Sequence, residues 1–415
     1  MPPTPPSVRA APESAAPLAA KGVAALVVLT GVTSALHVGK MPAAIPFLQQ
    51  SLGLTLLQAG FLLSVVQLAG MLLGLAVGLM ADRLGARRVM LIGLVVLAVG
   101  SVAGALAPSV GVLLGSRVVE GAGFLLAVLP APALLRQQVQ DPAVQARALG
   151  WWGAYMPLGT ALALLLGVPL MGALGWRGTW MLLAGLSLLA AAALARGLPE
   201  RRGAGPSALA QQPLWPRLAR TVSAPGPWLV ALAFFMYSGQ WMAVVGFLPA
   251  IYSQAGYTGA VVGGLSALAA GINMTGNIGA GRALARQVRP GMLLAAGYLA
   301  MAVGATLAFA AVGHPLLQYL GVLLFSALGG LIPGTLFGMA VALAPDEGTV
   351  STTVGWMQQF SSLGQFIGPP LVAWVAVQMG GWQSTWWVTG ACSLAGLLLA
   401  WRLQDAWRQR RPAAH

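Results

Sequence analysis

The chain has 415 residues, of which 58% are hydrophobic and only 7% are charged, and its formal net charge is +14. A soluble domain of this composition could not cover its surface with polar groups, so the sequence indicates a membrane protein. The positive charge does not indicate nucleic-acid binding, because the arginines stand singly or in pairs at the ends of apolar runs. The one cysteine, Cys392, lies within an apolar run, which excludes a disulfide framework and a cysteine-based metal site.

The first half of the chain is predicted to cross the membrane six times. Residues 1–21 are rich in proline and alanine, and we expect a disordered cytoplasmic tail there. The apolar run after Lys21 could imitate a signal peptide, but it continues to Phe47 and therefore predicts an uncleaved first span. The expected spans, each about 20 residues or longer, are 22–47, 55–81, 86–107, 110–136, 143–170 and 176–196. They form an N-terminal six-helix bundle over residues 22–196.

A polar interruption separates this bundle from a second one. Residues 197–225 are rich in proline, arginine and glutamine, and they are predicted to be a cytoplasmic linker. Six more spans are expected at 226–253, 258–284, 290–311, 314–343, 349–378 and 383–404. They form a C-terminal six-helix bundle over residues 226–404, and residues 405–415 are expected to be a second cytoplasmic tail.

The charge of the loops predicts the orientation of the chain. The loops near 48–54, 107–110, 254–257 and 379–382 contain no lysine or arginine, whereas the loops on the other side carry most of the arginines. The basic side is expected to be cytoplasmic, so both termini should lie inside a bacterial-type inner (plasma) membrane. The loop near 344–348 departs from this rule, because it carries Asp346 and Glu347 instead of arginine.

The loop between the second and third spans carries a family signature. It reads Gly78-Leu79-Met80-Ala81-Asp82-Arg83-Leu84-Gly85-Ala86-Arg87-Arg88, a tight turn with one acid and three arginines between two apolar runs. This segment resembles the loop 2–3 signature of the major facilitator superfamily, G-x-L-a-D-r-x-G-r-[RK]. A plain topology signal is the alternative. The resemblance implies a conformational switch loop that includes Gly78, Asp82, Arg83, Gly85, Arg87 and Arg88.

The two halves of the sequence repeat each other. A shift of 199 residues places Arg83 on Arg282 and Arg87 on Arg286, and these second arginines are added to the predicted switch loop. Two further matches, including a Gly-Trp…Thr-Trp pattern at 175–180 and 381–386, occur in the same order. Parallel repeats of this kind predict two bundles related by a pseudo-two-fold axis along the membrane normal. The predicted fold class is therefore an all-α integral membrane protein with 12 transmembrane helices in two pseudo-symmetric six-helix bundles, which the superfamily resemblance also implies.

Polar residues are distributed unevenly among the spans. Spans three, six, nine and twelve contain no internal glutamine, asparagine, histidine or acid, so we expect them to face lipid. Polar groups within the other spans should face the bundle interior or a wet cavity. The resemblance implies that helices one, four, seven and ten line a central path, with helices two, five, eight and eleven behind them.

The first half supplies the charged candidate residues. Thr33, His37 and Lys40 lie at i, i+4 and i+7 on one face of the first span. Arg117 and Glu120 are one helical step apart in a segment, 117–123, that resembles the superfamily helix-four motif R-x-x-x-G-x-G, which implies that this arginine acts in proton transfer or holds the coupling region. Three alternatives stay open: Lys40 could snorkel to the surface, His37 could be a packing residue, and Glu120 could be only the ion-pair partner of Arg117.

The second half offers aromatic and amide candidates without charge. Such groups provide stacking and hydrogen bonds for a substrate, although each one alone is more often a packing residue. Asn273 and Asn277 could instead join helix eight to a neighbouring helix. The candidate substrate residues of this half are Tyr237, Gln240, Trp241, Asn273, Trp356 and Gln359.

The motifs favour a transporter over an enzyme. The sequence contains no H-E-x-x-H, G-x-S-x-G or Walker A pattern, so we expect no enzymatic activity, no ATP-driven pumping, no cofactor and no metal. A non-transporting sensor is a weaker alternative, because a sensor would be expected to carry an added soluble domain. We expect a monomeric secondary transporter that works by alternating access. Its predicted partners are a small-molecule substrate, the proton and membrane lipids, without nucleic acid.

The charged residues of the spans suggest a substrate and a coupling ion. Glu120 is the only acid deep in a predicted span, and it stands against Lys40 and Arg117, which favours a small organic or anionic solute. We expect proton-coupled symport with Glu120 as the carrier and His37 as the fallback, while sodium coupling and facilitated diffusion stay open. The stretch 39–46 resembles the cyanate- and nitroimidazole-permease-like branch of the superfamily. The alternative is a proton-coupled exporter of drugs or metabolites, although Ala163-Leu164 replaces the Gly-Pro of the helix-five antiporter motif.

Overall fold

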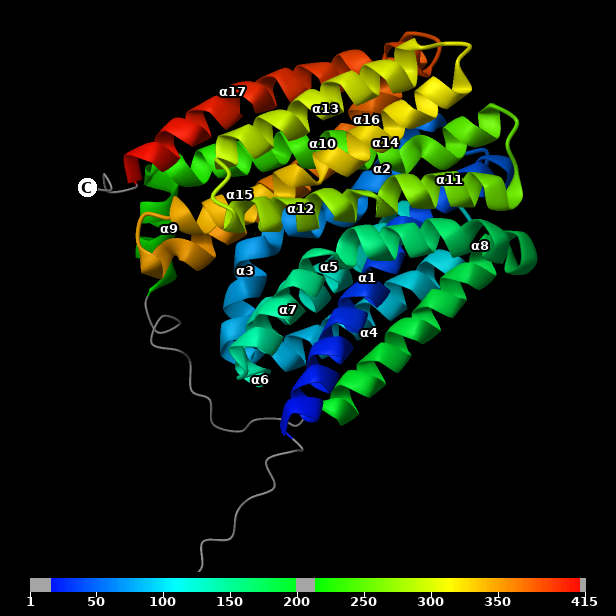
Figure 1. The fold of residues 1–415 in the computed structure, drawn as a ribbon. Helices are drawn as coiled ribbons and strands as arrows, with labels where there is room; N and C mark the ends of the chain where they lie inside the picture. The colour runs from blue at the N-terminus through cyan, green and yellow to red at the C-terminus, as the bar shows by residue number, and fades with distance from the viewer. Residues whose placement is uncertain (1–15, 199–212, 411–415) are drawn as a thin grey trace, which may run out of the picture.

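The computed structural model describes residues 16–198 and 213–410, and its regular elements are helices. They form eleven continuous helical segments, some made of two or three elements, that are long and apolar enough to cross a membrane. One of these, α8 (Tyr155–Gly197), holds two spans, because the backbone at Gly175 has φ 68 and breaks the helix. This left-handed conformation favours glycine, and Figure 1 shows α8 doubling back there. The eleven segments therefore provide twelve crossings, as the sequence predicts.

The first half runs from α1 to α8, and several of its predicted spans are interrupted. The second span begins at a capping box, in which the Thr55 side chain accepts a hydrogen bond from the Gln58 backbone and the Gln58 side chain accepts one from the Thr55 backbone. The turn between α3 and α4 is Gly85, at φ 89. The other elements of this half are α1 (Ala16–Leu52), α2 (Leu56–Ser64), η1 (Val65–Gln67), α3 (Leu68–Leu84), α4 (Ala86–Ala105), α5 (Val110–Val128), α6 (Ala131–Gln138) and α7 (Pro142–Gly153).

The second half repeats this pattern of long and interrupted spans. Its last helix continues to Arg410, so residues 405–410 of the predicted tail are helical. The elements are α10 (Pro225–Gln254), α11 (Gly259–Gly271), α12 (Asn273–Ala285), α13 (Pro290–Ala310), α14 (Pro315–Gly329), α15 (Leu331–Ala342), η2 (Glu347–Thr349), α16 (Val350–Gln378), η3 (Trp382–Ser384) and α17 (Trp386–Arg410).

The predicted linker contains a short helix, α9 (Leu214–Ser223). Arg217 of α9 is buried and donates through Nε to the Gly348 carbonyl over 2.8 Å. Arg220 pairs with Asp346 at 2.7 Å. These contacts give the acidic loop near 344–348 a partner and explain why it departs from the charge rule. The predicted tail over residues 1–15, the linker over 199–212 and residues 411–415 lie outside the described residues.

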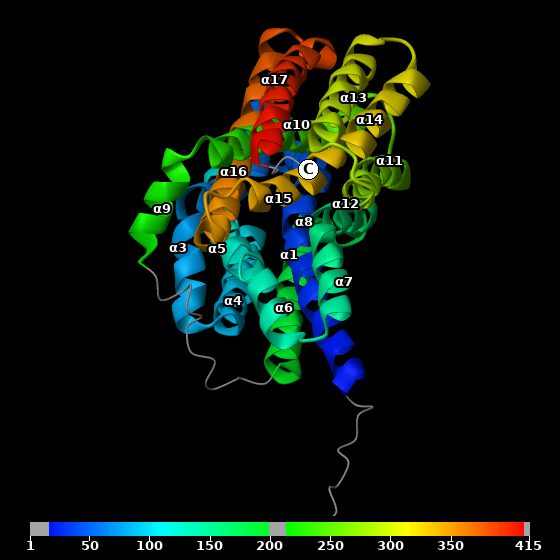
Figure 2. The same ribbon diagram turned by 60° about the vertical axis from the view of Figure 1, so that its left-hand side comes forward.

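The two halves form separate groups of helices, with α3 to α7 in one and α13 to α17 in the other (Figures 1 and 2). They meet where α1 packs on α10, α8 on α11, and α2 and α3 on α16. In Figure 1 the groups diverge toward the edge where α6, α9 and the end of α17 lie. The close contacts between the halves therefore lie toward the side away from the termini.

Candidate functional site

A buried charged cluster lies inside the first half, between α1 and α5. Glu120 contacts two cations, because its Oε1 accepts a hydrogen bond from Lys40 Nζ and its Oε2 accepts one from Arg117 Nη1. Glu120 and Arg117 are 0% exposed and Lys40 is 1% exposed. One carboxylate thus faces two cations away from water, where ionic contacts are strong and unpaired charges are costly.

Histidine and hydroxyl groups complete this cluster. His37 Nε2 lies 2.8 Å from Ser187 Oγ on α8, within hydrogen-bond distance. On the other side of the imidazole ring, His37 Nδ1 lies 3.3 Å from Lys40 Nζ. Lys40 Nζ also donates to Ser101 Oγ of α4 over 2.9 Å and lies 4.3 Å from the ring centroid of Trp180. Lys40 is therefore held within the bundle and does not snorkel to the surface.

Close helix packing positions Arg117 in the cluster. Its Nη1 donates to the His37 carbonyl over 2.8 Å, and its Nε donates to the Leu62 carbonyl of α2 over 3.4 Å. A Cβ at Gly121 would overlap the Val66 carbonyl oxygen, and a Cβ at Gly123 would overlap the Leu97 backbone nitrogen. The two glycines of the helix-four motif therefore let α5 approach η1 and α4 closely enough to bury the arginine.

The structure brings together His37, Lys40, Arg117 and Glu120, but not Thr33. The Thr33 hydroxyl donates to the Leu29 carbonyl of its own helix over 2.9 Å. The Arg117–Glu120 ion pair considered in the sequence analysis is present. The partners in the hydrogen bonds and ion pairs described for the cluster all belong to the first half.

A second polar network joins α10, α12 and α14 in the other half. Tyr237 and Asn273 exchange hydrogen bonds, with Asn273 Nδ2 donating to the tyrosine hydroxyl over 3.0 Å. Asn273 also donates to the Ser326 carbonyl over 2.9 Å, and Trp241 Nε1 donates to the Ser326 hydroxyl over 3.3 Å. Asn277 donates to the side chain of Asn273 over 2.9 Å. Asn273 therefore ties α12 to α10 and α14, whereas the hydrogen bonds of Asn277 stay within α12.

The remaining residues of the predicted aromatic and amide wall lie elsewhere. Gln240 donates to the Met236 carbonyl and accepts a hydrogen bond from Ser393 of α17 over 3.1 Å. Trp356 packs edge-to-face on Trp228, with ring centroids 5.1 Å apart. The wall is thus split, with Tyr237, Trp241 and Asn273 in one network and the other residues in separate contacts.

Amide side chains also bridge the two halves. Gln67 Nε2 of η1 donates to Gln365 Oε1 of α16 over 3.0 Å, and Ser362 donates to Gln67 Oε1 over 3.4 Å. Gln359 Nε2 donates to the Met71 carbonyl over 3.0 Å. We call these contacts of Gln67, Met71, Gln359, Ser362 and Gln365 the amide bridge. They must separate if α3 and α16 are to move apart.

The predicted switch loop is only partly described. Arg87 donates to the Ala195 carbonyl at the end of α8 over 2.7 Å, and so holds this turn against the sixth crossing. Arg282 and Arg286 are exposed near the end of α12. Gly78, Asp82 and Arg83 belong to α3, but the side chains of Asp82 and Arg83 are not among the described groups, so the proposed role of the acid stays a prediction.

Several residues of these sites escape sequence reasoning. Ser101, Trp180 and Ser187 come from spans three and six, which were expected to face lipid because they contain no amide, histidine or acid. The expectation overlooked small hydroxyl groups and indole rings, which carry only a weak signal in an apolar run. Ser326 escaped for the same reason.

The family model described as Major Facilitator Superfamily matches residues 24–359. Curated relatives include the methylenomycin A resistance protein of Streptomyces coelicolor, 32% identical over 162 residues, which are 39% of this chain and 34% of that protein. The puromycin resistance protein pur8 of Streptomyces alboniger is 32% identical over 163 residues, which are 39% of this chain and 32% of that protein. The match thus spans about a third of the length of these relatives.

Solved structures support the fold over nearly the whole chain. A bacterial homolog of the human lysosomal transporter Spinster, in an inward-facing and occupied conformation, gives a TM-score of 0.79 at 14% identity, covering 95% of this chain and 98% of that one. A D-xylose–proton symporter gives a TM-score of 0.72 at 16% identity, covering 92% and 97%. At this identity the likeness establishes the shared 12-helix fold.

Proposed function

We propose that this chain, which belongs to the Major Facilitator Superfamily, is a proton-coupled exporter of organic compounds that works by alternating access. The observation that carries this proposal is the location of the charges. Lys40 and Arg117 are bound to Glu120 inside the first half, and the buried polar network of the second half consists of amides, hydroxyls and aromatic rings. A path of that kind suits uncharged or amphipathic solutes better than strongly charged ones.

The relatives favour the same class of substrate. The proteins named above are resistance proteins for methylenomycin A and puromycin, and another relative, from Mycobacterium tuberculosis, is the multidrug resistance protein Stp, 37% identical over 110 residues. Those alignments cover a minority of each chain, so the direction and the substrate are part of the proposal. We give these relatives more weight than the incomplete helix-five antiporter motif, because the evidence of that motif against export is the substitution of Ala163-Leu164 for Gly-Pro.

The contacts between the halves suggest which state is present. The packing of α8 on α11 lies toward the side away from the termini (Figure 1). The amide bridge lies near the middle of the spans, since Gln359 and Gln365 are within the first and middle parts of α16. If the termini are cytoplasmic, as the loop charges predict, the chain is closed toward the outside and ready to load from the cytoplasm. Opening the outer side would then require the amide bridge to break.

Glu120 is the proposed proton carrier. When ionised, it compensates part of the charge of Lys40 and Arg117. Protonation would leave two buried cations without a counter-charge, which is strongly unfavourable in a water-free interior. The cluster can relieve that cost by rearranging so that water or an anionic group reaches the cations, and this change of packing would couple proton binding to movement of the helices.

Symport of a small anion is the second candidate. The observation that favours it is the surplus of one positive charge when Lys40, Arg117 and Glu120 are all ionised and His37 is neutral. Such a surplus would attract an anion if the cluster became accessible. The two candidate functions differ in the direction of the pH gradient that drives accumulation of the substrate.

The deciding experiment uses full-length protein in proteoliposomes. A thermal-shift panel of neutral and cationic organic compounds, including puromycin, and of small carboxylates and inorganic anions first selects a compound that stabilises the protein. Export by proton antiport predicts that an organic compound accumulates when the lumen is acidic. Accumulation of a small anion on a gradient that is acidic outside would instead establish the second candidate and overturn the first.

A further inference from the structure

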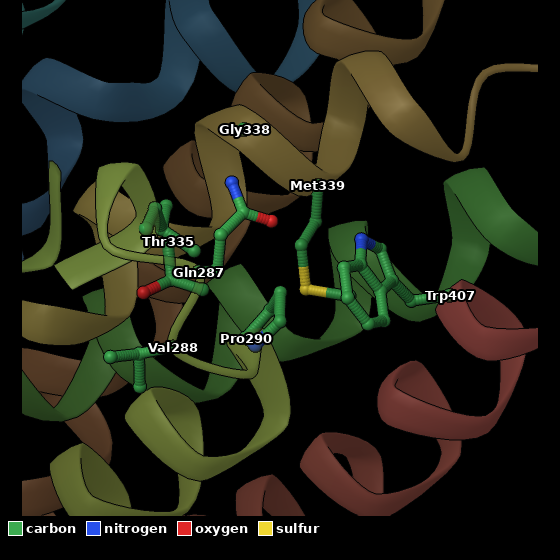
Figure 3. Close-up of a pocket in the computed structure, with 8 residues that line it drawn as sticks. Gln287, Val288, Pro290, Thr335, Gly338, Met339 and Trp407 are labelled. Carbon is green, nitrogen blue, oxygen red and sulfur yellow. The ribbon is translucent and has the colours of Figure 1, made fainter. Parts of the chain in front are cut away.

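A pocket lies in the second half where the turn between α12 and α13 meets α15 and α17. Its lining is mainly apolar and includes Val288, Pro290, Met339 and Trp407. Figure 3 shows the side chains of Pro290, Met339 and Trp407 gathered around it. Gly338 leaves one wall without a side chain, since a Cβ there would meet only Leu284, at 3.6 Å. The pocket is therefore able to accept a hydrocarbon chain.

Three arginines lie close in sequence to the residues that line this pocket. Arg282, Arg286 and Arg289 alternate in sequence with the lining residues Leu284 and Val288, and all three are exposed. Within the described part of the chain, no ion pair joins their guanidinium groups to an acid. The turn thus presents uncompensated positive charge close to the apolar pocket, at the end of the second half where α17 ends (Figure 1).

We propose that this pocket binds an acidic phospholipid, with its phosphate on the arginines of the turn and part of one acyl chain against Met339 and Trp407. Guanidinium groups bind phosphate oxygens with paired hydrogen bonds. In a zwitterionic lipid such as phosphatidylcholine the choline group compensates the phosphate, so the arginines attract it less than they attract an acidic lipid. A free phosphate would leave the apolar lining unused. Orientation of the chain by positive loops accounts for the arginines, but it does not account for the pocket beside them.

The proposal is independent of transport and can be tested by native mass spectrometry of the full-length protein in detergent. Phosphatidylglycerol and phosphatidylcholine with identical long acyl chains are added in equal amounts. We expect phosphatidylglycerol to be retained roughly tenfold more, because its net negative charge is attracted by the arginines of the turn. The double variant Arg286→Gln/Arg289→Gln should lose most of this preference.

Two further variants separate the pocket from general surface charge. Gly338→Leu should fill the hollow and reduce retention while the arginines remain. Arg136→Gln is the matched control, since Arg136 is likewise an exposed arginine at a helix end, in the first half. It should leave retention unchanged. If Gly338→Leu does not fold, phosphatidylglycerol with short acyl chains replaces it as a probe and should bind much more weakly to the wild type.

Three results would overturn the proposal. Equal retention of phosphatidylcholine would remove the role of the arginines. An equal loss in Arg136→Gln would reduce the effect to overall charge. Full displacement of phosphatidylglycerol by glycerol phosphate would show that the site holds a free phosphate and does not use the acyl chain.

Discussion

At the scale of single residues, the first bundle depends on one carboxylate that serves two cations. Glu120 contacts Lys40 and Arg117 at the same time, and no water-exposed surface remains on it. Removing one member of a buried ionic group is costly when an uncompensated charge stays behind. Glu120, Lys40 and Arg117 should therefore contribute unequally to stability.

Glu120→Gln is expected to destabilise the protein more than Lys40→Met. The first change leaves two buried cations without a counter-charge and should cost about 3–5 kcal/mol. The second leaves the Arg117–Glu120 pair, whose charges are matched. The melting temperatures of the purified variants provide the comparison. Ser187→Ala, which removes only the hydroxyl contact of His37, should cost about 1 kcal/mol and serves as control. A larger loss in Lys40→Met than in Glu120→Gln would contradict this charge assignment.

The sequence predicts part of this cluster. The i, i+3 spacing places Arg117 beside Glu120, and the i, i+3 spacing of His37 and Lys40 places both on one side of α1. Ser101 and Trp180 could not be predicted, because their contacts with Lys40 arise only when α4 and the second arm of α8 pack against α1. The direction of Lys40, into the bundle and not toward a surface, likewise depends on that packing.

At the scale of the helices, close backbone packing around α5 holds the cluster in place. A Cβ at Gly123 would overlap the backbone of α4 at Leu97, whereas Gly115, two turns earlier on the same helix, has nothing within 4 Å. Helices that approach through small residues gain packing contacts and cannot easily accept a larger side chain. The helix-four motif therefore has a structural reason for its glycines.

Gly123→Ala should lower the melting temperature and the yield of folded protein, because either α4 or α5 must shift to admit the added carbon. Gly115→Ala adds the same carbon to open space and should be neutral, or stabilising by up to about 1 kcal/mol through helix propensity. Thermal unfolding of both variants in the same detergent tests this. Similar melting temperatures for the two alanine variants would mean that the α4–α5 contact is not tightly packed.

The existence and order of the helices could be predicted from apolar runs, but their interruptions could not. The second span is divided into α2, η1 and α3, and the break at Val65–Gln67 lies where Gln67 reaches the second half. A one-turn interruption leaves the apolar run intact, so hydropathy does not reveal it. The helix α9 was missed because its docking on Asp346 and Gly348 is a tertiary contact.

At the scale of the whole molecule, the internal repeat predicts two bundles, and the structure confirms the twelve-crossing fold. The predicted aromatic and amide wall is less uniform than expected. Tyr237 and Trp241 are one helical turn apart and share the Asn273 network, whereas Gln240 points toward α17. The type of each residue and its position along a span could be predicted from the sequence. The arrangement of the helices around each side chain could not.

The orientation of the molecule remains a prediction from loop charge. Reporter fusions after residues 50, 110 and 255 should be active on the periplasmic side, and fusions at residues 210 and 410 should be active in the cytoplasm. Each position is compared using a reporter that functions only outside and one that functions only inside. A reversed pattern would place the packing of α8 on α11 on the cytoplasmic side and would remove the basis for the proposed loading state.

Proton coupling through Glu120 is the central claim, and one transport measurement tests it most directly. Glu120→Gln and wild-type protein are reconstituted in proteoliposomes with the compound selected by the panel, and Ser187→Ala is the control. We predict that Glu120→Gln loses accumulation driven by a pH gradient but keeps exchange of labelled for unlabelled substrate, since exchange moves no net proton. If Glu120→Gln still accumulates substrate on a pH gradient, Glu120 is only the structural partner of Lys40 and Arg117.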